Sequence, residues 1–425
     1  MKAIIKPARL SGNVTPPASK SMMQRVCAGA LLHKGKTIII NPGHSDDDKA
    51  ALQIIQDMGA EIVVRKPELV EIISNGIVNP PDTIQCGESG LSARLFTPIA
   101  AMADKQVTIT GTGSLLLRPM NVLHDILPQL GVELPGFSGY LPIKVHGPLR
   151  AKSVSIDGSL SSQYLTGVLF ALTAATELPI TIEVADLNSR PYIDLTLNVL
   201  GQFGKKVQHQ DYKVFSIDPS TFAPEEVVTV TIESDWSSAA FLLAAGAING
   251  NVSVGGLDVN STQADKAIVT VLKQAGADIQ LHENRITVTS GKKLRAFKTD
   301  TTHSPDLFPI LSILASCCEG ESEIAGIKRL TNKESNRANS ICEMLYQFGV
   351  TFRVEDDSLM ITGTSKLRAA TIDSYKDHRI AMAAAIGGLN ADGPVTITGA
   401  ETVSKSYPAF FGHLASLGAE SNLIS

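Results

Sequence analysis

The 425-residue chain lacks the cysteine patterns, basic charge and long apolar runs that mark several large classes of protein. Its cysteines are odd in number and show no C-x-x-C spacing, which argues against a disulfide framework or a zinc site and favours a reducing compartment. A formal net charge of −5 provides no global positive field for a nucleic-acid backbone. The five cysteines are Cys27, Cys86, Cys317, Cys318 and Cys342.

Familiar nucleotide and metal motifs are missing as well. The sequence has no G-x-x-x-x-G-K-[ST] loop, no G-x-G-x-x-G after a strand and no H-E-x-x-H. These absences argue against ATP hydrolysis, dinucleotide binding and zinc-dependent hydrolysis. No apolar run is long and pure enough to span a bilayer. The first residues, MKAIIKPARLSG, lack the apolar core of a signal peptide. These absences predict a cytoplasmic protein with no membrane or nucleic-acid partner.

The most prominent feature that is present is an internal repeat. Six times an amphipathic stretch leads into a glycine and then into a strand-like tail, with the glycines about 70 residues apart. A glycine after a helical pattern predicts a C-terminal cap in the left-handed conformation, which glycine adopts without steric strain. The six glycines are Gly59, Gly131, Gly204, Gly276, Gly349 and Gly418.

A second series of segments precedes these glycines. Each begins with polar residues and continues as a small, apolar run typical of a helix buried on nearly every face, and a strand pattern follows it. Each repeat is therefore predicted to contain one buried helix, one surface helix and several strands. A chain of this length, 44% hydrophobic and 19% charged, predicts two or more domains, with three repeats in each. The buried segments begin at Ser19, Glu88, Ser159, Ser234, His303 and Lys376.

The polar starts of the buried segments indicate a binding function. The first turn of a helix exposes unpaired N–H groups and the positive end of the helix dipole, which suits an anion. Serine and aspartate are also the preferred N-caps, so one such start taken alone is better explained by capping. The charged groups near Arg118, Lys333 and Asp377 are, taken singly, typical of a solvated surface. Their recurrence at equivalent points of six repeats favours a site for a small polyanion.

Taken together, these segments resemble the EPSP synthase family, the 3-phosphoshikimate 1-carboxyvinyltransferases among the enolpyruvyl transferases. No single segment is specific, but the ordered set is, and it covers the whole chain. The segments are SKSMMQR at Ser19, CGESGLSAR at Cys86, SSQYLTG at Ser161, SRPYIDLT at Ser189, Asp306, KESNR at Lys333, DHRIAM at Asp377 and SKSYP at Ser404.

The resemblance implies an α/β fold, a two-domain inside-out α/β barrel of six repeated β/α units with three units per domain. It divides the chain into a discontinuous domain of residues 1–19 and 234–425 and a continuous domain of residues 20–233. In the family the active site lies in the interdomain cleft, and the domains close over the substrates and exclude water. The resemblance also implies a monomer.

The reaction implied by the resemblance joins two small polyanions. The 5-hydroxyl of shikimate 3-phosphate adds to C2 of phosphoenolpyruvate while C3 takes a proton, and the tetrahedral adduct then loses phosphate and a C3 proton. No metal or organic cofactor takes part. Two polyanionic substrates are consistent with cations gathered locally on an acidic protein.

Site roles follow from the resemblance residue by residue. Lys20, Asp306 and Glu334 would be catalytic, with Lys20 at the reacting centre, Asp306 at the reacting hydroxyl and Glu334 as the acid that protonates C3. Arginine suits the clamp on phosphoenolpyruvate because its planar fork pairs with carboxylate or phosphate at two points. The residues matching contacts to shikimate 3-phosphate are Ser21, Arg25, Ser161, Ser162, Gln163, Ser189, Tyr192, Asp306 and Lys333. Those matching contacts to phosphoenolpyruvate are Lys20, Gly90, Arg118, Gln163, Arg337, Arg379 and Lys405.

The glycine-rich segment departs from the family pattern Gly-Asn-x-Gly-Thr. It has Glu88 in place of asparagine and Leu91 in place of threonine, and Leu95 stands where proline is usual. A carboxylate here would repel phosphoenolpyruvate unless Glu88 turns away or pairs with a cation such as Arg94. The family's inhibitor glyphosate occupies the site beside the residue matching Gly90, so we expect weakened glyphosate binding while turnover persists.

Three alternatives stay open at the level of sequence. A sister family transfers enolpyruvyl to UDP-N-acetylglucosamine on the same fold, but it typically carries Lys-Asn near its start and a loop cysteine, whereas this chain has Lys20-Ser21 and no such loop. A non-catalytic repeat scaffold is the second, although it needs no inward set of lysine, glutamate and arginine. The third is a family member that has lost or altered its activity because of Glu88.

Overall fold

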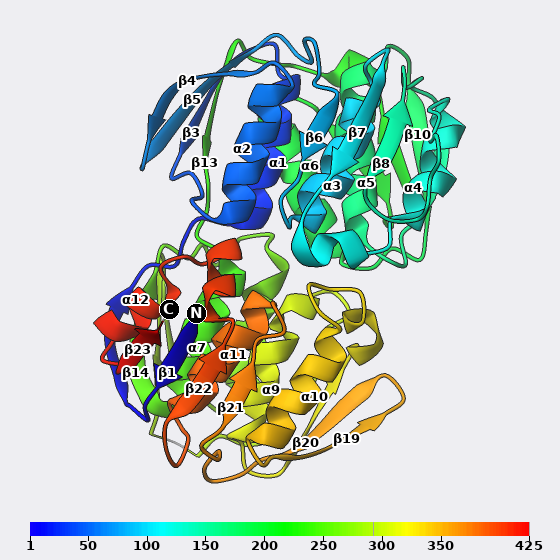
Figure 1. The fold of residues 1–425 in the computed structure, drawn as a ribbon. Helices are drawn as coiled ribbons and strands as arrows, with labels where there is room; N and C mark the ends of the chain where they lie inside the picture. Colours follow the sequence, from blue (N-terminus) through cyan, green and yellow to red (C-terminus); the bar gives the residue numbers. More distant parts are fainter. Residues whose placement is uncertain (292, 425) are drawn as a thin grey trace. The chain divides into compact units, whose positions relative to one another are not determined.

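The computed structural model describes residues 1–291 and 293–424. The chain forms two compact units with separate hydrophobic cores (Figure 1). Unit 1 consists of Met1–Pro17 and the chain from Glu233 onward, and unit 2 of Ala18–Ile232. Within the described residues, no helix combines the length and the hydropathy needed to cross a membrane.

Unit 2 contains three β/α repeats. Its described strands form three sheets with the orders β13-β3-β5-β4, β6-β7-β8 and β11-β12-β10-β9. The helices are α1 (Lys20–Leu32), α2 (Asp46–Asp57), α3 (Gly90–Ala100), α4 (Asn121–Ile126), α5 (Ser162–Ala175) and α6 (Arg190–Gln202). The strands are β3 (Gly35–Ile40), β4 (Glu61–Lys66), β5 (Leu69–Ser74), β6 (Thr83–Gln85), β7 (Gln106–Thr110), β8 (Ile143–His146), β9 (Val154–Asp157), β10 (Ile180–Ala185), β11 (Val207–Gln210), β12 (Val214–Ile217) and β13 (Val227–Thr231).

Unit 1 contains three further repeats, and the N-terminal strands complete two of its sheets. Its described strands form sheets with the orders β21-β22-β1-β23, β15-β16-β14-β2 and β17-β18-β20-β19. The helices are α7 (Trp236–Asn249), α8 (Ile268–Gln274), α9 (Phe308–Ser316), α10 (Arg337–Gln347), α11 (His378–Gly388) and α12 (Phe410–Ser416). The strands are β1 (Lys2–Ile5), β2 (Leu10–Val14), β14 (Gly250–Gly255), β15 (Asp278–His282), β16 (Arg285–Thr289), β17 (Lys298–Asp300), β18 (Glu321–Ala325), β19 (Thr351–Glu355), β20 (Ser358–Thr362), β21 (Thr371–Asp373), β22 (Val395–Thr398) and β23 (Ser421–Ile424).

The predicted buried helices are confirmed as α1, α3, α5, α7, α9 and α11, whose residues lie almost entirely in the two cores. Small residues allow them to approach closely. In unit 2, α3 contacts α5, and a side chain on Gly167 would lie 2.4 Å from the carbonyl oxygen of Arg94. A glycine is therefore required where these two helices meet.

All six predicted glycine caps are confirmed. Each has a positive φ, between +69° at Gly204 and +112° at Gly59, which is the left-handed region that favours glycine. The strand-like tail predicted after Gly131 is reduced to an isolated bridge between Glu133 and His146. Pro135 follows closely and has no N–H to donate to a ladder, which explains the shorter sheet of this repeat.

Candidate functional site

The starts of the buried helices carry both capping residues and predicted site residues. Ser19, Ser89, Ser161, Asp235 and Asp377 each accept a hydrogen bond from a backbone N–H in the first turn of the helix that follows. These residues therefore cap their helices, as the more conservative interpretation held. Ser161 is both a cap and a predicted substrate-binding residue, and other predicted substrate-binding residues stand one or two positions after a cap. In unit 2 these are Lys20, Ser21, Gly90, Ser162 and Gln163, and in unit 1 Arg379.

Lys20 begins α1 and forms an ion pair that the sequence analysis missed. Its Nζ lies 3.0 Å from Oδ2 of Asp47, and both side chains are largely buried. Asp47 belongs to a run of three aspartates in the first turn of α2, where negative charge is favoured by the helix dipole. The run SDDDK was the available signal, but it predicted only a helix start.

Arg25 is 1% exposed and joins three helices of unit 2. Its Nε donates to Thr196 Oγ1 at 2.9 Å, Nη1 to the Ser21 carbonyl at 2.7 Å, and Nη2 to the Tyr192 carbonyl at 3.2 Å. Burial lowers the pKa of Arg25 to about 10. The structure thus brings the predicted residues Ser21, Arg25 and Tyr192 together, with Arg25 beneath them as an internal cross-link.

The serines predicted to bind phosphate lie at the starts of two neighbouring helices. Ser161 and Ser162 begin α5, and Ser189 precedes α6 with a left-handed φ of +56°. Asn188 donates from its side chain to the Ser159 carbonyl at 2.8 Å, which ties the two starts together. A strained backbone held beside two helix N-termini is typical of an anion site.

Gly90, Arg118 and Glu88 form a compact group at the start of α3. A side chain on Gly90 would lie 2.4 Å from Nη1 of Arg118, so the guanidinium packs directly on this glycine. The Glu88 carboxylate accepts hydrogen bonds from the N–H (3.2 Å) and the hydroxyl (3.0 Å) of Ser114. Ser114 lies in the 3₁₀ helix η1 (Gly113–Leu117), which ends at Arg118. Glu88 therefore braces the segment that carries this arginine.

Gln163 is held by Arg94, which the sequence suggested only as a possible partner of Glu88, whereas Glu88 binds Ser114. Nη1 of Arg94 donates to Oε1 of Gln163 at 2.8 Å, and its guanidinium lies 5.1 Å from the centre of the Tyr164 ring. The contact fixes the orientation of the Gln163 amide, because its oxygen faces the arginine and its NH2 group faces elsewhere.

Arg337 is the centre of the charged group in unit 1. Its side chain is 0% exposed and contacts three carboxylates: Nη1 lies 2.8 Å from Asp306, Nε 2.8 Å from Asp377, and Nη2 pairs with Glu334. Burial alone would lower the pKa of Arg337, but Asp377, Glu334 and Asp306 together raise it. We call Arg337 with these three acids the Arg337 cluster.

Asp306 joins the Arg337 cluster to a second arginine. It lies in η5 (Pro305–Leu307), and its Oδ2 is 2.9 Å from Nη2 of Arg379. Burial would raise the pKa of Asp306, but Arg379, Lys333 and Arg337 outweigh it and hold the pKa well below its usual range. Burial lowers the pKa of Lys333 to about 8, although Asp306 opposes this. Lys405, at the end of η7 (Ala400–Lys405), is buried.

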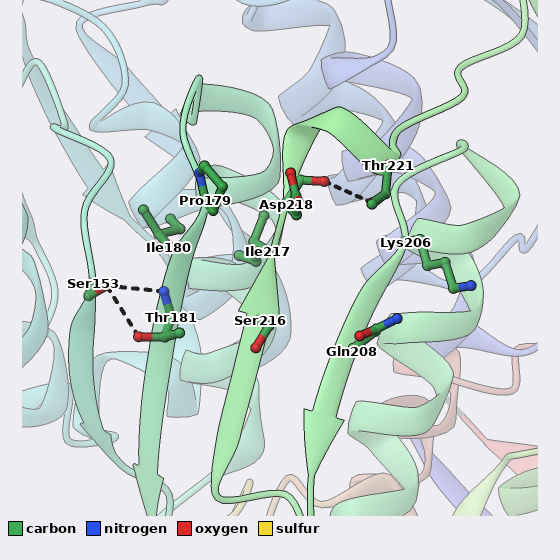
Figure 2. A pocket seen from close by; sticks show the side chains of 10 residues that line it. All are labelled: Ser153, Pro179, Ile180, Thr181, Lys206, Gln208, Ser216, Ile217, Asp218 and Thr221. Carbon is green, nitrogen blue, oxygen red and sulfur yellow. Dashed lines mark hydrogen bonds between the residues drawn. The ribbon is translucent and has the colours of Figure 1, made fainter.

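The groove in Figure 2 belongs to another part of unit 2. It has a volume of about 360 Å³ and lies on the sheet formed by β9 to β12. Ser153 accepts hydrogen bonds there from the N–H (3.0 Å) and hydroxyl (3.2 Å) of Thr181. None of the predicted site residues lines it.

Comparisons with known proteins cover almost the whole chain. The family model described as EPSP synthase (3-phosphoshikimate 1-carboxyvinyltransferase) matches residues 4–414. A curated relative named 3-phosphoshikimate 1-carboxyvinyltransferase, from Clostridium kluyveri, is 37% identical over 420 residues, which is 98% of this chain and 97% of the relative. Another of that name, from Methanocaldococcus jannaschii, is 35% identical over 420 residues, or 97% of each chain. A solved EPSP synthase structure from Acinetobacter baumannii aligns with a TM-score of 0.82 at 27% identity over 99% of this chain and 100% of that chain, which confirms the predicted fold class.

Proposed function

The chain belongs to the EPSP synthase family, and from this membership we propose that it transfers the enolpyruvyl group of phosphoenolpyruvate to the 5-hydroxyl of shikimate 3-phosphate. The family's reaction is the enolpyruvyl transfer step of the shikimate pathway. The observation that carries the proposal is the Arg337 cluster. In this cluster the proposed acid, Glu334, and the proposed base, Asp306, pair with one arginine, and Asp306 also pairs with Arg379. The chain matches the family model over residues 4–414.

We propose that residues of unit 2 hold shikimate 3-phosphate. The phosphate would accept hydrogen bonds from the hydroxyls of Ser161, Ser162 and Ser189 and from the helix starts beside them. The carboxylate would be bound by Ser21 with Arg25. Lys333 of unit 1, whose lowered pKa leaves it partly deprotonated near pH 8, would contribute to the same substrate.

Phosphoenolpyruvate would be held by cationic and polar side chains whose orientation is fixed by neighbouring residues. Lys20 is oriented by Asp47, Gln163 by Arg94, and Arg118 by its packing on Gly90. In unit 1, Arg337, Arg379 and Lys405 would complete the clamp. Carboxylates already accept hydrogen bonds from four of the five N–H donors of Arg337, so a substrate that binds through two of these donors would replace at least one carboxylate contact.

Replacement of a carboxylate partner of Arg337 by the substrate would link substrate binding to the proton transfers. Asp306 is held ionised by its cations, so it is able to accept the proton of the 5-hydroxyl as the oxygen bonds to C2, and substrate charge that draws Arg337 or Arg379 away would raise its basicity. Glu334 must carry a proton to protonate C3, whereas its ion pair with Arg337 favours the carboxylate. Arrival of substrate charge at Arg337 weakens that pair. In the elimination Glu334 takes a C3 proton back, the C2–O bond to phosphate breaks, and the hydroxyl proton leaves with the phosphate.

Substitution of Glu334 tests the proposal directly. We expect the wild-type protein to release phosphate from phosphoenolpyruvate only when shikimate 3-phosphate is present. Glu334→Gln keeps the shape of the side chain and its contact with Arg337 but removes the acid, so kcat should fall by roughly 10²- to 10⁴-fold. Phosphate release is measured in a coupled assay with each acceptor separately.

A matched control comes from α10, the helix that follows Glu334. Glu343 is exposed on α10, and Glu343→Gln makes the same chemical change there, so it should leave kcat within error. Release that depends on UDP-N-acetylglucosamine would favour the sister reaction. Thermal stabilisation by shikimate 3-phosphate without any release would favour a family member that binds but does not react.

We further propose that the enzyme acts as a monomer in the cytoplasm. All five cysteines are free in the described part of the chain, which is consistent with a reducing compartment. Light scattering coupled to size exclusion tests the oligomeric state, with a mass near the 45.1 kDa of one chain as the expected result.

A further inference from the structure

Asp265 is a buried acid that the proposed reaction does not use. It lies in the short 3₁₀ helix η4 (Ala264–Ala267), and only 1% of its surface is exposed. Ser237, in the first turn of α7, donates its hydroxyl to Oδ2 of Asp265. The other oxygen, Oδ1, is fully enclosed and has no hydrogen-bond partner among the described residues. An unpaired, enclosed carboxylate oxygen is costly, so this group requires an explanation.

The charges that act on Asp265 belong to the proposed site. Helix α7 contacts both η4 and η5, and η5 carries Asp306. The charged groups that act most strongly on Asp265 are Asp306 in η5, Arg379 in α11 and Asp235 at the start of α7. The other charged residue of η4 is Lys266, and α8, which packs on η4, carries Lys273. Asp265 thus shares Asp306 and Arg379 with the proposed substrate clamp.

The two neighbouring acids respond to these surroundings in opposite ways. Burial is the main reason that the pKa of Asp265 rises to about 7, and Asp306 raises it further against the opposing effects of Arg379 and Ser237. The pKa of Asp306 moves well below its usual range despite its own burial, because Arg379, Lys333 and Arg337 pair with it. Below neutral pH the pair therefore holds one proton, on Asp265, and one negative charge, on Asp306.

Resting on the function proposed above, we propose that Asp265 is a positioning residue for phosphoenolpyruvate. When Asp265 is a neutral acid, Arg379 interacts with Asp306 and the substrate alone. When Asp265 is a carboxylate, it competes with them for the positive charge of Arg379. It acts through Arg379 and Asp306 rather than on the reacting atoms. The enclosed position of Oδ1 keeps the carboxyl neutral, because water cannot solvate its charged form.

The pH profile of kcat/KM for phosphoenolpyruvate tests this role. In the wild type it should fall by about tenfold as the pH rises through the ionisation of Asp265, the factor expected for coupling of one pKa unit. Asp265→Asn keeps the shape and cannot ionise, so it should retain activity at pH 6 and lack this fall. Titration of the substrate affects both proteins equally, and their difference isolates Asp265. Superimposable profiles for the two proteins would overturn the proposal.

Two further variants guard against a folding defect. The Ser237 hydroxyl lowers the pKa of Asp265, so Ser237→Ala should move the fall to higher pH. Asp258 is exposed and lies seven positions before Asp265, so Asp258→Asn makes the same chemical change and should give the wild-type profile. If kcat/KM of Ser237→Ala fell at the same pH as in the wild type, the assignment of this fall to Asp265 would be contradicted.

Thermal unfolding without substrate separates this inference from the proposed function. The folded-state pKa of Asp265, about 7, lies above its unfolded value, so its stabilising effect is complete at low pH and is lost as the pH rises toward 7. The Tm of Asp265→Asn relative to wild type should therefore increase between about pH 4 and pH 7 and then level off. A Tm difference that stays constant over this pH range would overturn the proposal that Asp265 is a neutral acid in the folded protein. If the wild type showed no turnover, the same comparison would be made on the Tm shift produced by phosphoenolpyruvate.

Discussion

At the residue scale, the charge of Arg337 is balanced within unit 1 by Asp306, Glu334 and Asp377. A buried arginine left with fewer partners would be unstable, because desolvation of an unpaired charge costs several kcal/mol. The affinity for an anionic substrate is therefore a difference between two sets of ion pairs. This explains why the residues proposed as acid and base are also the resting partners of the proposed clamp.

Gly90 provides a test of the clamp in unit 2. A methyl group at this position would meet Nη1 of Arg118 at 2.4 Å, so Gly90→Ala must displace the guanidinium. Loss of one charged hydrogen bond costs about 1.5–3 kcal/mol, and KM for phosphoenolpyruvate should rise by roughly ten- to a hundredfold. Gly201 in α6 has no atom within 4 Å of an added methyl group, so Gly201→Ala is the control. An unchanged KM in Gly90→Ala would exclude Arg118 from substrate binding.

The weak binding of glyphosate expected from Glu88 stays a prediction. The carboxylate is bound to Ser114, which braces the segment ending at Arg118 and leaves a negative charge near the proposed clamp. Half-inhibition should need roughly tenfold more glyphosate than phosphoenolpyruvate, the ratio that 1.4 kcal/mol of repulsion produces. Glu88→Gln keeps an acceptor for Ser114 and removes the charge, so it should lower the inhibition constant. Equal inhibition constants for the two proteins would show that Glu88 does not act on the inhibitor.

At the scale of elements, the caps and buried helices were predictable because their signals are local. A glycine after an amphipathic stretch and a small, apolar helix with a polar start are each contained in a dozen or so residues. The supporting partners of the site were not predictable. Arg25 and Thr196 are 171 positions apart in the sequence. The residues around Asp47 and Asp265 show no local sequence pattern that distinguishes these acids from acids on the surface. Only tertiary packing determines such pairs.

The caps themselves can be tested at Gly349, which ends α10 with a φ of +71°. A methyl group there would meet Nε of Arg368 at 2.5 Å and force alanine into the left-handed region. Gly349→Ala should therefore destabilise the protein by about 1 kcal/mol or more. Gly412 lies inside α12 with open space around it, and Gly412→Ala should stabilise by about 0.5–1 kcal/mol. Urea unfolding of both variants should give shifts of opposite sign, and shifts of equal sign would contradict the interpretation.

At the scale of the whole molecule, six copies of one supersecondary pattern provide two hydrophobic cores with three buried helices each. The number of repeats and their content of helices and strands followed from the sequence because each copy carries its own helix and strand signals. The class of fold and the assignment of chemistry to particular residues followed from the family resemblance, because the repeats alone do not distinguish a catalytic acid from a helix cap.

The position of β1 has a consequence for biosynthesis. This strand lies between β22 and β23, which are synthesised much later because they stand far behind it in the sequence. At about 5–20 residues per second, β1 waits for roughly 20–80 seconds before both partners exist. Residues 18–232 are contiguous and are complete much earlier. Unit 2 can therefore fold before unit 1 is complete, whereas the sheet that contains β1 forms only once β22 and β23 have been made, and β1 must stay unaggregated until then.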